Sequence, residues 1–303
     1  VSAAICVDEF QDIAGVPLLM DVLRALSLGG DRSTSEIGAD LHYRLDLGRA
    51  PLLRLVCARD ADPQRWLGIL LLHHLALDHS SLEVLVQEIS AVLQGHGAQL
   101  PPAVPYRNYV AQARLGLGEP EHSAFFRQML GDIDEPTLAF GLQDVNRDGS
   151  GIREQQLRLE PALCRRLRQQ ARSLGVSVAS LMHLAWGRVL GCLANQQQVV
   201  FGTVLLGRMQ GGEGAERALG VFINTLPLRV DVGADDVRAG VLLTHRRLTA
   251  LLGHEQASLA LAQRCSAVAV PTPLFSAILN YRHSSVEEVA EVIDIAPGVH
   301  VLG

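Results

Sequence analysis

Two adjacent histidines followed by an aspartate could carry out chemistry in this chain. His73 and His74 precede Asp78 and end the apolar run that starts at Trp66. An imidazole is the usual general base near neutral pH because its pKa needs little adjustment. An acidic neighbour such as Asp78 can fix the tautomer of the imidazole, hold the loop, or pair with an Arg. If the strand runs on, successive side chains point to opposite faces, so one His meets a substrate while the other packs inside.

The same residues allow two plainer interpretations. Two histidines in a strand followed by an aspartate are often core or loop residues. His73, His74, Asp78 and His79 are also all possible metal ligands. Neighbours on opposite strand faces do not converge on one ion, however, and zinc takes about four tetrahedral ligands. The pattern therefore disfavours a metal site.

The elements that position these residues follow from the hydrophobic pattern. The run at 66–74 lacks polar alternation, which is typical of a strand buried on both faces. The apolar residues of 82–93 recur at helical spacing. Ser80 and Glu83 are expected to form a capping box at the start of this helix, and Gly95 is expected to stop it.

The rest of the chain mixes both kinds of element. Helices are predicted at 17–28, 106–115, 119–130, 161–174, 178–193 and 235–252. Ser177 is expected to be the N-cap of the helix 178–193. Strands are predicted at 52–57, 152–159, 198–206, 221–230 and 274–281. The polar stretch 132–150 is interpreted as a linker between a domain of residues 1–131 and a second of residues 151–303. This mixture predicts an α/β or α+β fold.

Composition narrows the class of protein. The chain has 303 residues and is 48% hydrophobic, which is enough for a sizeable core. Its net charge of −6 disfavours a nucleic acid or an anionic membrane as partner. No apolar run reaches the roughly 20 residues of a membrane helix. Five widely spaced cysteines and no recognisable signal peptide fit a reducing cytoplasm.

The motif His73-His74-x-x-x-Asp78 resembles the HHxxxDG signature of condensation domains in nonribosomal peptide synthetases, which have the chloramphenicol-acetyltransferase-like fold. Other segments that resemble family motifs, in the family's order, are 45–55, 106–110, 219–230, 254–256, 273–275 and 279–281. The resemblance implies two such subdomains forming a V, with the His-Asp loop at their junction. Both are expected to be incomplete, because the opening motifs are not visible in residues 1–40 and the chain stops before the family's usual end.

The resemblance also implies an activity. Donor acyl or peptidyl and acceptor aminoacyl thioesters, each on the 4′-phosphopantetheine arm of a carrier protein domain, would be joined through an amide bond. The expected partners are those carrier domains and the adenylation domain of the same synthetase. The chain itself is expected to bind no cofactor and no metal.

The family pattern assigns roles to individual residues. His74, beside His73, would orient or deprotonate the acceptor amine, while Asp78 would be structural and paired with an Arg. His79 occupies the place where the family usually has Gly. The expected residues of the substrate tunnel are His79, Ser80, Asn224, Thr225 and Tyr281. A plainer role for Asn224 is to bond a neighbouring backbone at a strand end.

Three alternatives stay open on the sequence alone. The domain could also epimerise its donor. It could be a free-standing acyltransferase of the same fold that esterifies a free alcohol from a coenzyme A thioester. It could also be a non-catalytic, truncated remnant that only docks carrier proteins.

Overall fold

The computed structural model describes residues 2–8, 32–33, 45–59, 65–143, 153–208, 212–233, 236–282, 292–296 and 299–302. The chain forms two compact units of mixed helix and strand, which makes the fold α+β. Unit 1 comprises Val1–Val110, Gly211–Phe222 and Ser284–Gly303, and unit 2 comprises Ala111–Gln210 and Ile223–His283. The helix predicted at 17–28 lies outside the described residues.

These units are interleaved along the chain, unlike the predicted domains 1–131 and 151–303. Residues 111–131 belong to unit 2, because Phe126, Met129 and Leu130 are part of its hydrophobic core. The described part of the predicted linker 132–150, up to Gln143, also lies in unit 2. Composition along the chain does not reveal that distant segments pack together. As a division into folding domains, the predicted boundaries stay a prediction.

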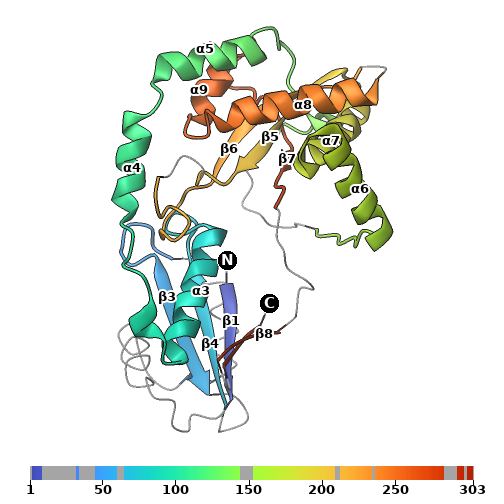
Figure 1. The fold of residues 1–303 in the computed structure, drawn as a ribbon. Helices are drawn as coiled ribbons and strands as arrows, with labels where there is room; N and C mark the ends of the chain where they lie inside the picture. The colour runs from blue at the N-terminus through green and yellow to red at the C-terminus, as the bar shows by residue number, and fades with distance from the viewer. Residues whose placement is uncertain are drawn as a thin grey trace. The chain divides into compact units, whose positions relative to one another are not determined.

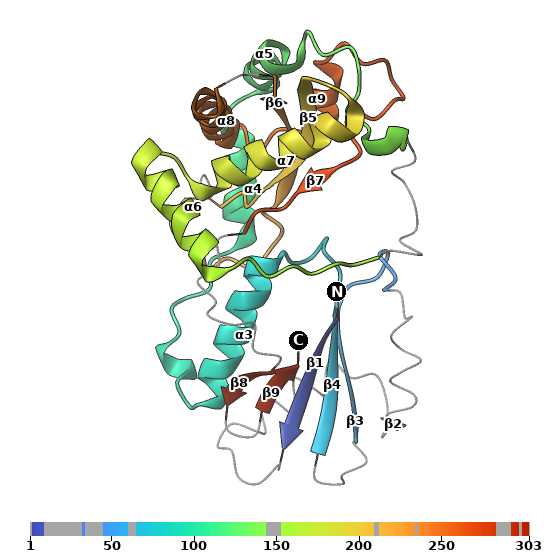
Figure 2. The same ribbon diagram turned by 90° about the vertical axis from the view of Figure 1, so that its right-hand side faces the viewer.

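A six-stranded sheet forms the body of unit 1, in the order β2-β3-β4-β1-β9-β8. The strands are β1 (Ser2–Asp8), β2 (Arg32–Ser33), β3 (Leu53–Arg59), β4 (Arg65–Leu72), β8 (Val292–Ala296) and β9 (Val299–Leu302). Helix α3 (His79–Leu93) runs beside this sheet (Figure 2) and packs Leu82 and Leu85 against it. Leu70 and Leu71, which are neighbours in β4, are both buried. This confirms the strand buried on both faces for the end of β4 nearest the histidines.

Unit 2 packs helices on a three-stranded sheet with the order β6-β5-β7 (Figure 1). Its strands are β5 (Gln198–Leu205), β6 (Asn224–Asp231) and β7 (Ile278–Leu279). Its helices are α5 (Glu119–Leu130), α6 (Pro161–Leu174), α7 (Val178–Ala194), α8 (Val237–Leu252) and α9 (Leu259–Arg264), and α4 (Tyr106–Leu115) joins the two units. Short 3₁₀ turns lie at Gly97–Gln99 and Ala139–Gly141. Phe201, Leu226 and Leu251 are fully buried in its core.

Local capping explains why several helices match the prediction. The predicted bounds of α4, α5 and α6 are confirmed, and α7 is one residue longer than predicted. The Ser177 hydroxyl accepts the Ser180 N–H, which confirms Ser177 as the N-cap. Gly95 follows the C-cap of α3 at φ +79°, a backbone conformation that glycine adopts without steric cost.

Two predicted strands are wrong or much shortened. The described residues 153–159 have no regular structure and are exposed, so the strand predicted at 152–159 is not observed there. The strand predicted at 274–281 is reduced to β7, which pairs with β5. Alternating side chains do not make a strand unless a second backbone supplies hydrogen bonds.

No single helix among the described residues is long and apolar enough to cross a membrane. Helices α6 and α7 meet the length and composition criteria only as a pair bent by 106°.

Candidate functional site

The two histidines lie in a tight turn of unit 1, not in a continuing strand. β4 ends at Leu72, and the His73 N–H donates to the Leu52 carbonyl at 3.1 Å. The Ala76 N–H then donates back to the His73 carbonyl at 2.8 Å. His73 therefore still bonds to the neighbouring strand, and the chain turns away at His74. The expectation that the two side chains point to opposite faces applied to a strand that runs on, and β4 does not run on past Leu72.

Backbone hydrogen bonds give the two imidazoles opposite tautomers. His74 is exposed, and its Nδ1 lies 3.3 Å from the Leu77 carbonyl oxygen. Since a carbonyl only accepts, this bond requires a proton on Nδ1, and in the neutral imidazole it leaves the lone pair on Nε2. His73 is half-buried, and its Nδ1 accepts the Leu75 N–H at 3.1 Å, so its Nε2 carries the proton. Of the two, His74 presents an Nε2 that can accept a proton.

Asp78 is a buried N-cap whose carboxylate accepts two backbone N–H groups. Its side chain is 1% exposed. One oxygen accepts the Ser81 N–H at 2.8 Å and the other accepts the Phe222 N–H at 3.0 Å. The predicted capping box of Ser80 and Glu83 is wrong, because α3 already begins at His79 and Asp78 supplies the cap. The ion pair between Asp78 and an Arg stays a prediction.

Two residues of a distant segment, Gly220 and Phe222, are bonded to this loop, and Val221 between them is bonded to Tyr106 of α4. The Asp78 N–H donates to the Gly220 carbonyl at 3.0 Å. The Ser81 hydroxyl donates to the same carbonyl at 2.8 Å and accepts the Gly220 N–H at 3.0 Å. The Tyr106 hydroxyl donates to the Val221 carbonyl. Sequence reasoning missed Ser81, although its place three residues after Asp78, at the third position of the helix, was a usable signal.

An aromatic cluster packs behind this segment in unit 1. The Phe222 ring is 1% exposed and lies 5.3 Å from the Tyr106 ring and 4.4 Å from the Tyr109 ring, centroid to centroid. The motif segments 106–110 and 219–230, both singled out in the sequence, therefore meet at Phe222. Their contact supports the backbone of Phe222, whose N–H donates to the Asp78 carboxylate.

The neighbouring residues His79 and Ser80 occupy the first turn of α3. Nε2 of His79 lies 3.3 Å from a carboxylate oxygen of Glu83, one helical turn on, and both side chains are about half exposed. Such an exposed pair contributes little to stability. Ser80 is half-buried.

The other expected tunnel residues lie in unit 2. Asn224 starts β6, and its side-chain amide donates to the Glu255 carbonyl at 2.8 Å and to the Ala257 carbonyl at 2.7 Å. This is the plainer role weighed for Asn224, a strand-end residue that holds a neighbouring backbone. Thr225 pairs with Val204 of β5, and Tyr281 follows β7 and is half-buried.

Unit 2 also contains the buried His122 and His183 and the half-buried His254, which the sequence did not single out as a group. The Nδ1 atoms of His122 and His254 lie 2.9 Å apart, so one ring donates to the other. Burial lowers the pKa of both imidazoles below the usual value, only partly offset at His122 by Glu121. His183 is 2% exposed, and burial lowers its pKa as well.

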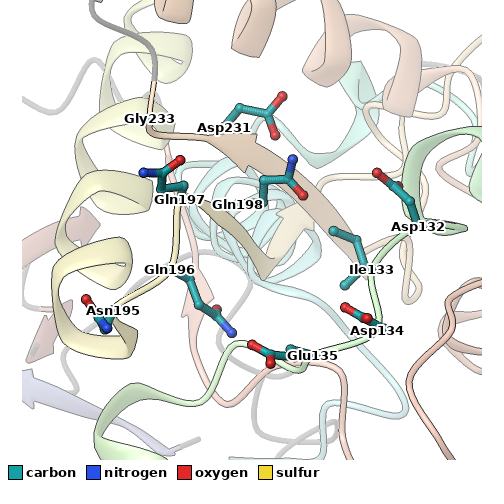
Figure 3. A pocket seen from close by; sticks show the side chains of 10 residues that line it. All are labelled: Asp132, Ile133, Asp134, Glu135, Asn195, Gln196, Gln197, Gln198, Asp231 and Gly233. Atoms are coloured by element: carbon teal, nitrogen blue, oxygen red, sulfur yellow. The ribbon is translucent and has the colours of Figure 1, made fainter.

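A solvent-open pocket of about 550 Å³ lies at one end of β5 and β6 in unit 2 (Figure 3). Its lining includes Asp132, Asp134, Glu135 and Asp231. A hydrogen bond from Arg229 lowers the pKa of Asp132. Burial alone would raise the pKa of Asp231, but hydrogen bonds from Arg247 and Arg229 outweigh it and lower that pKa. None of the expected site residues lines this pocket, and two of its carboxylates already serve as ion-pair partners.

Comparisons with known proteins agree with the motif in unit 1. The family model of the condensation domain matches residues 29–294. Malpibaldin synthetase of Mortierella alpina is 54% identical over 243 residues, which cover 80% of this chain and 4% of that protein. Malpinin synthetase of the same organism is 53% identical over 261 residues, covering 86% of this chain and 3% of that protein. The chain thus spans only a small part of the length of these relatives.

A solved structure shows the same fold. The X-domain from teicoplanin biosynthesis superposes with a TM-score of 0.68 at 17% identity, covering 92% of this chain and 72% of that chain. The family model matches most of this chain, and the turn that carries His74 and Asp78 is present. This chain therefore belongs to the condensation-domain family.

Proposed function

We propose that this chain joins a donor acyl or peptidyl thioester to an acceptor aminoacyl thioester through an amide bond, with both substrates on carrier proteins. Amide-bond formation between carrier-bound substrates is the general function of condensation domains in peptide synthetases. The observation that supports it here is the exposed imidazole of His74, whose Nδ1 is bonded to the Leu77 carbonyl. That bond leaves Nε2 to act as the base.

The proposed reaction moves one proton through His74. As the acceptor amine attacks the thioester carbonyl, Nε2 of His74 takes a proton from the nitrogen and the new C–N bond forms. The C–S bond then breaks, and the proton passes to the departing thiolate. General base catalysis contributes about 10²- to 10⁴-fold in rate. Holding the two thioesters in line contributes up to about 7–11 kcal/mol.

The remaining site residues receive proposed roles of two kinds. His73 and Asp78 shape the turn, which their backbone and carboxylate hydrogen bonds support. His79, Ser80, Asn224, Thr225 and Tyr281 are proposed to border the substrate tunnel. The 4′-phosphopantetheine arms would arrive on the carrier domains, loaded by an adenylation domain of the same synthetase. A cytoplasmic location is part of the same proposal.

The test is the intact mass of an acceptor carrier protein mixed with a loaded donor carrier and this chain. We expect the acceptor to gain the mass of the donor acyl group. His74→Ala should slow that gain by about 10²- to 10⁴-fold. His96→Ala is the matched control, because His96 is an exposed histidine of the same unit outside the turn.

Other outcomes would count against the proposal. Equal rates for His74→Ala and His96→Ala would remove His74 from the mechanism. Transfer to a free alcohol, but not to a carrier-bound amine, would instead favour a free-standing acyltransferase. Absence of transfer to either acceptor would favour the carrier-docking remnant.

A further inference from the structure

One peptide group in unit 1 connects His74 to the distant segment 220–222. The carbonyl of the Leu77–Asp78 peptide accepts His74 Nδ1 at 3.3 Å, and the N–H of the same peptide donates to the Gly220 carbonyl at 3.0 Å. A peptide group is planar and rigid. Its carbonyl and N–H therefore turn together, and any rotation that breaks one bond disturbs the other.

The Gly220 carbonyl is itself held in place by Ser81. The Ser81 hydroxyl donates to that carbonyl at 2.8 Å and accepts the N–H of the same residue at 3.0 Å. Ser81 is fully buried on the first turn of α3, so water does not compete for these bonds. A serine so placed fixes both backbone groups of Gly220 with one oxygen.

The position of Gly220 is restricted on another side by the Tyr106 ring. A Cβ added at Gly220 would overlap ring atoms of Tyr106. The Tyr106 hydroxyl also bonds the Val221 carbonyl, and the Asp78 carboxylate accepts the Phe222 N–H. The backbone at 220–222 is thus held at three consecutive residues.

We propose that Ser81 and Gly220 are positioning residues that fix the tautomer of His74 through the Leu77–Asp78 peptide. Without the Ser81 hydroxyl, the Gly220 carbonyl loses a donor and the peptide plane is less restrained. The His74 proton can then move from Nδ1 to Nε2, and an Nε2 that carries a proton cannot act as a base. The consequence for rate rests on the proposed function, but the consequence for the tautomer does not.

The tautomer is measured by ¹⁵N NMR of the full chain labelled at histidine, with the His74 signals identified by their loss in His74→Gln. At about pH 9, above the pKa at which an imidazole ordinarily loses its proton, the unmodified chain should carry its proton on Nδ1. Ser81→Ala should raise the share of the Nε2–H form. Ser90→Ala, the same substitution near the other end of α3, should leave the share unchanged.

Amide hydrogen exchange gives a second, independent measure. The Asp78 N–H should be protected, and Ser81→Ala should speed its exchange by about fivefold or more, the factor expected for one hydrogen bond. In the condensation assay, Ser81→Ala should lower kcat by up to about 10²-fold while KM changes little. A purely structural role would lower the amount of active protein without changing the tautomer of the folded fraction.

An Nε2–H tautomer in the unmodified chain, or a tautomer unaffected by Ser81→Ala, would overturn the inference. Should Ser81→Ala fail to fold, the tautomer of the unmodified chain and the protection of its Asp78 amide decide the question. The expected tautomer in a chain that forms no amide would contradict the proposed function and leave the positioning role standing.

Discussion

Replacing Asp78 tests whether this carboxylate holds the turn in place. Asp78→Ala removes the N-cap of α3, which costs about 1 kcal/mol. It also leaves the N–H of Phe222 without its carboxylate partner, which costs about 1–3 kcal/mol for a buried donor. We therefore expect the free energy of unfolding to fall by about 2–4 kcal/mol. Asp78→Asn keeps one acceptor oxygen but presents an N–H group to the other donor, so its loss should be smaller.

Urea unfolding followed by circular dichroism measures this loss, and hydrogen exchange at Ser81 and Phe222 localises it. With a urea dependence of about 2 kcal/mol per molar, the midpoint should fall by about 1–2 M. Asp134→Ala, a control at an exposed carboxylate, should change stability by no more than about 0.5 kcal/mol. If Asp78→Ala unfolds at the same urea concentration as Asp134→Ala, the two hydrogen bonds do not stabilise the turn and the reasoning fails.

Three further predictions concern other parts of the two units. Because burial lowers the pKa of His183, the unfolded chain binds a proton below about pH 6.5 that the folded chain does not, so the free energy of unfolding should fall as the pH drops below that value. His183→Gln should flatten this pH dependence in urea unfolding between pH 8 and 5, and an unchanged dependence would contradict the prediction. Gly220→Ala should destabilise unit 1 by about 3 kcal/mol, because the added Cβ would overlap the Tyr106 ring. In a double-mutant cycle, Tyr106→Ala should relieve part of this loss, and strictly additive losses would argue against the overlap. Asn224→Ala should destabilise unit 2 by about 1–3 kcal/mol and lower its melting temperature, because the carbonyls of Glu255 and Ala257 each lose a donor. A melting temperature equal to that of the unmodified chain would show that these two hydrogen bonds make no net contribution to stability.

Much of the helical structure was predictable because its signals are local. The bounds of α4, α5 and α6 follow from apolar spacing and from Pro or Gly at their ends. The motif around His74 and Asp78 was equally readable, since its residues lie within a few positions of one another. Residues a few positions apart are held close together by the backbone itself, so their spacing in the sequence is enough to predict that they lie in one helix or one loop.

The strands depended on partners that the sequence does not identify. Residues 153–159 alternate like a strand but form none, while β6 gains its place by pairing with β5 over eight residues. Whether an alternating segment becomes a strand is decided by which backbone lies beside it. The same dependence explains why the predicted strand at 274–281 is reduced to two residues.

The sequence by itself determined which residues could do the chemistry, and the tertiary structure decided how they are held. Asp78 was expected to fix a neighbouring imidazole, hold the loop or pair with an Arg, yet one of its oxygens bonds a backbone group 144 positions away, at Phe222. Ser81 drew no attention because its partner, Gly220, is 139 positions distant. Hydrogen-bond partners of buried polar groups are supplied by whichever segments pack against them, and that packing is a property of the whole fold, not of any local stretch of chain.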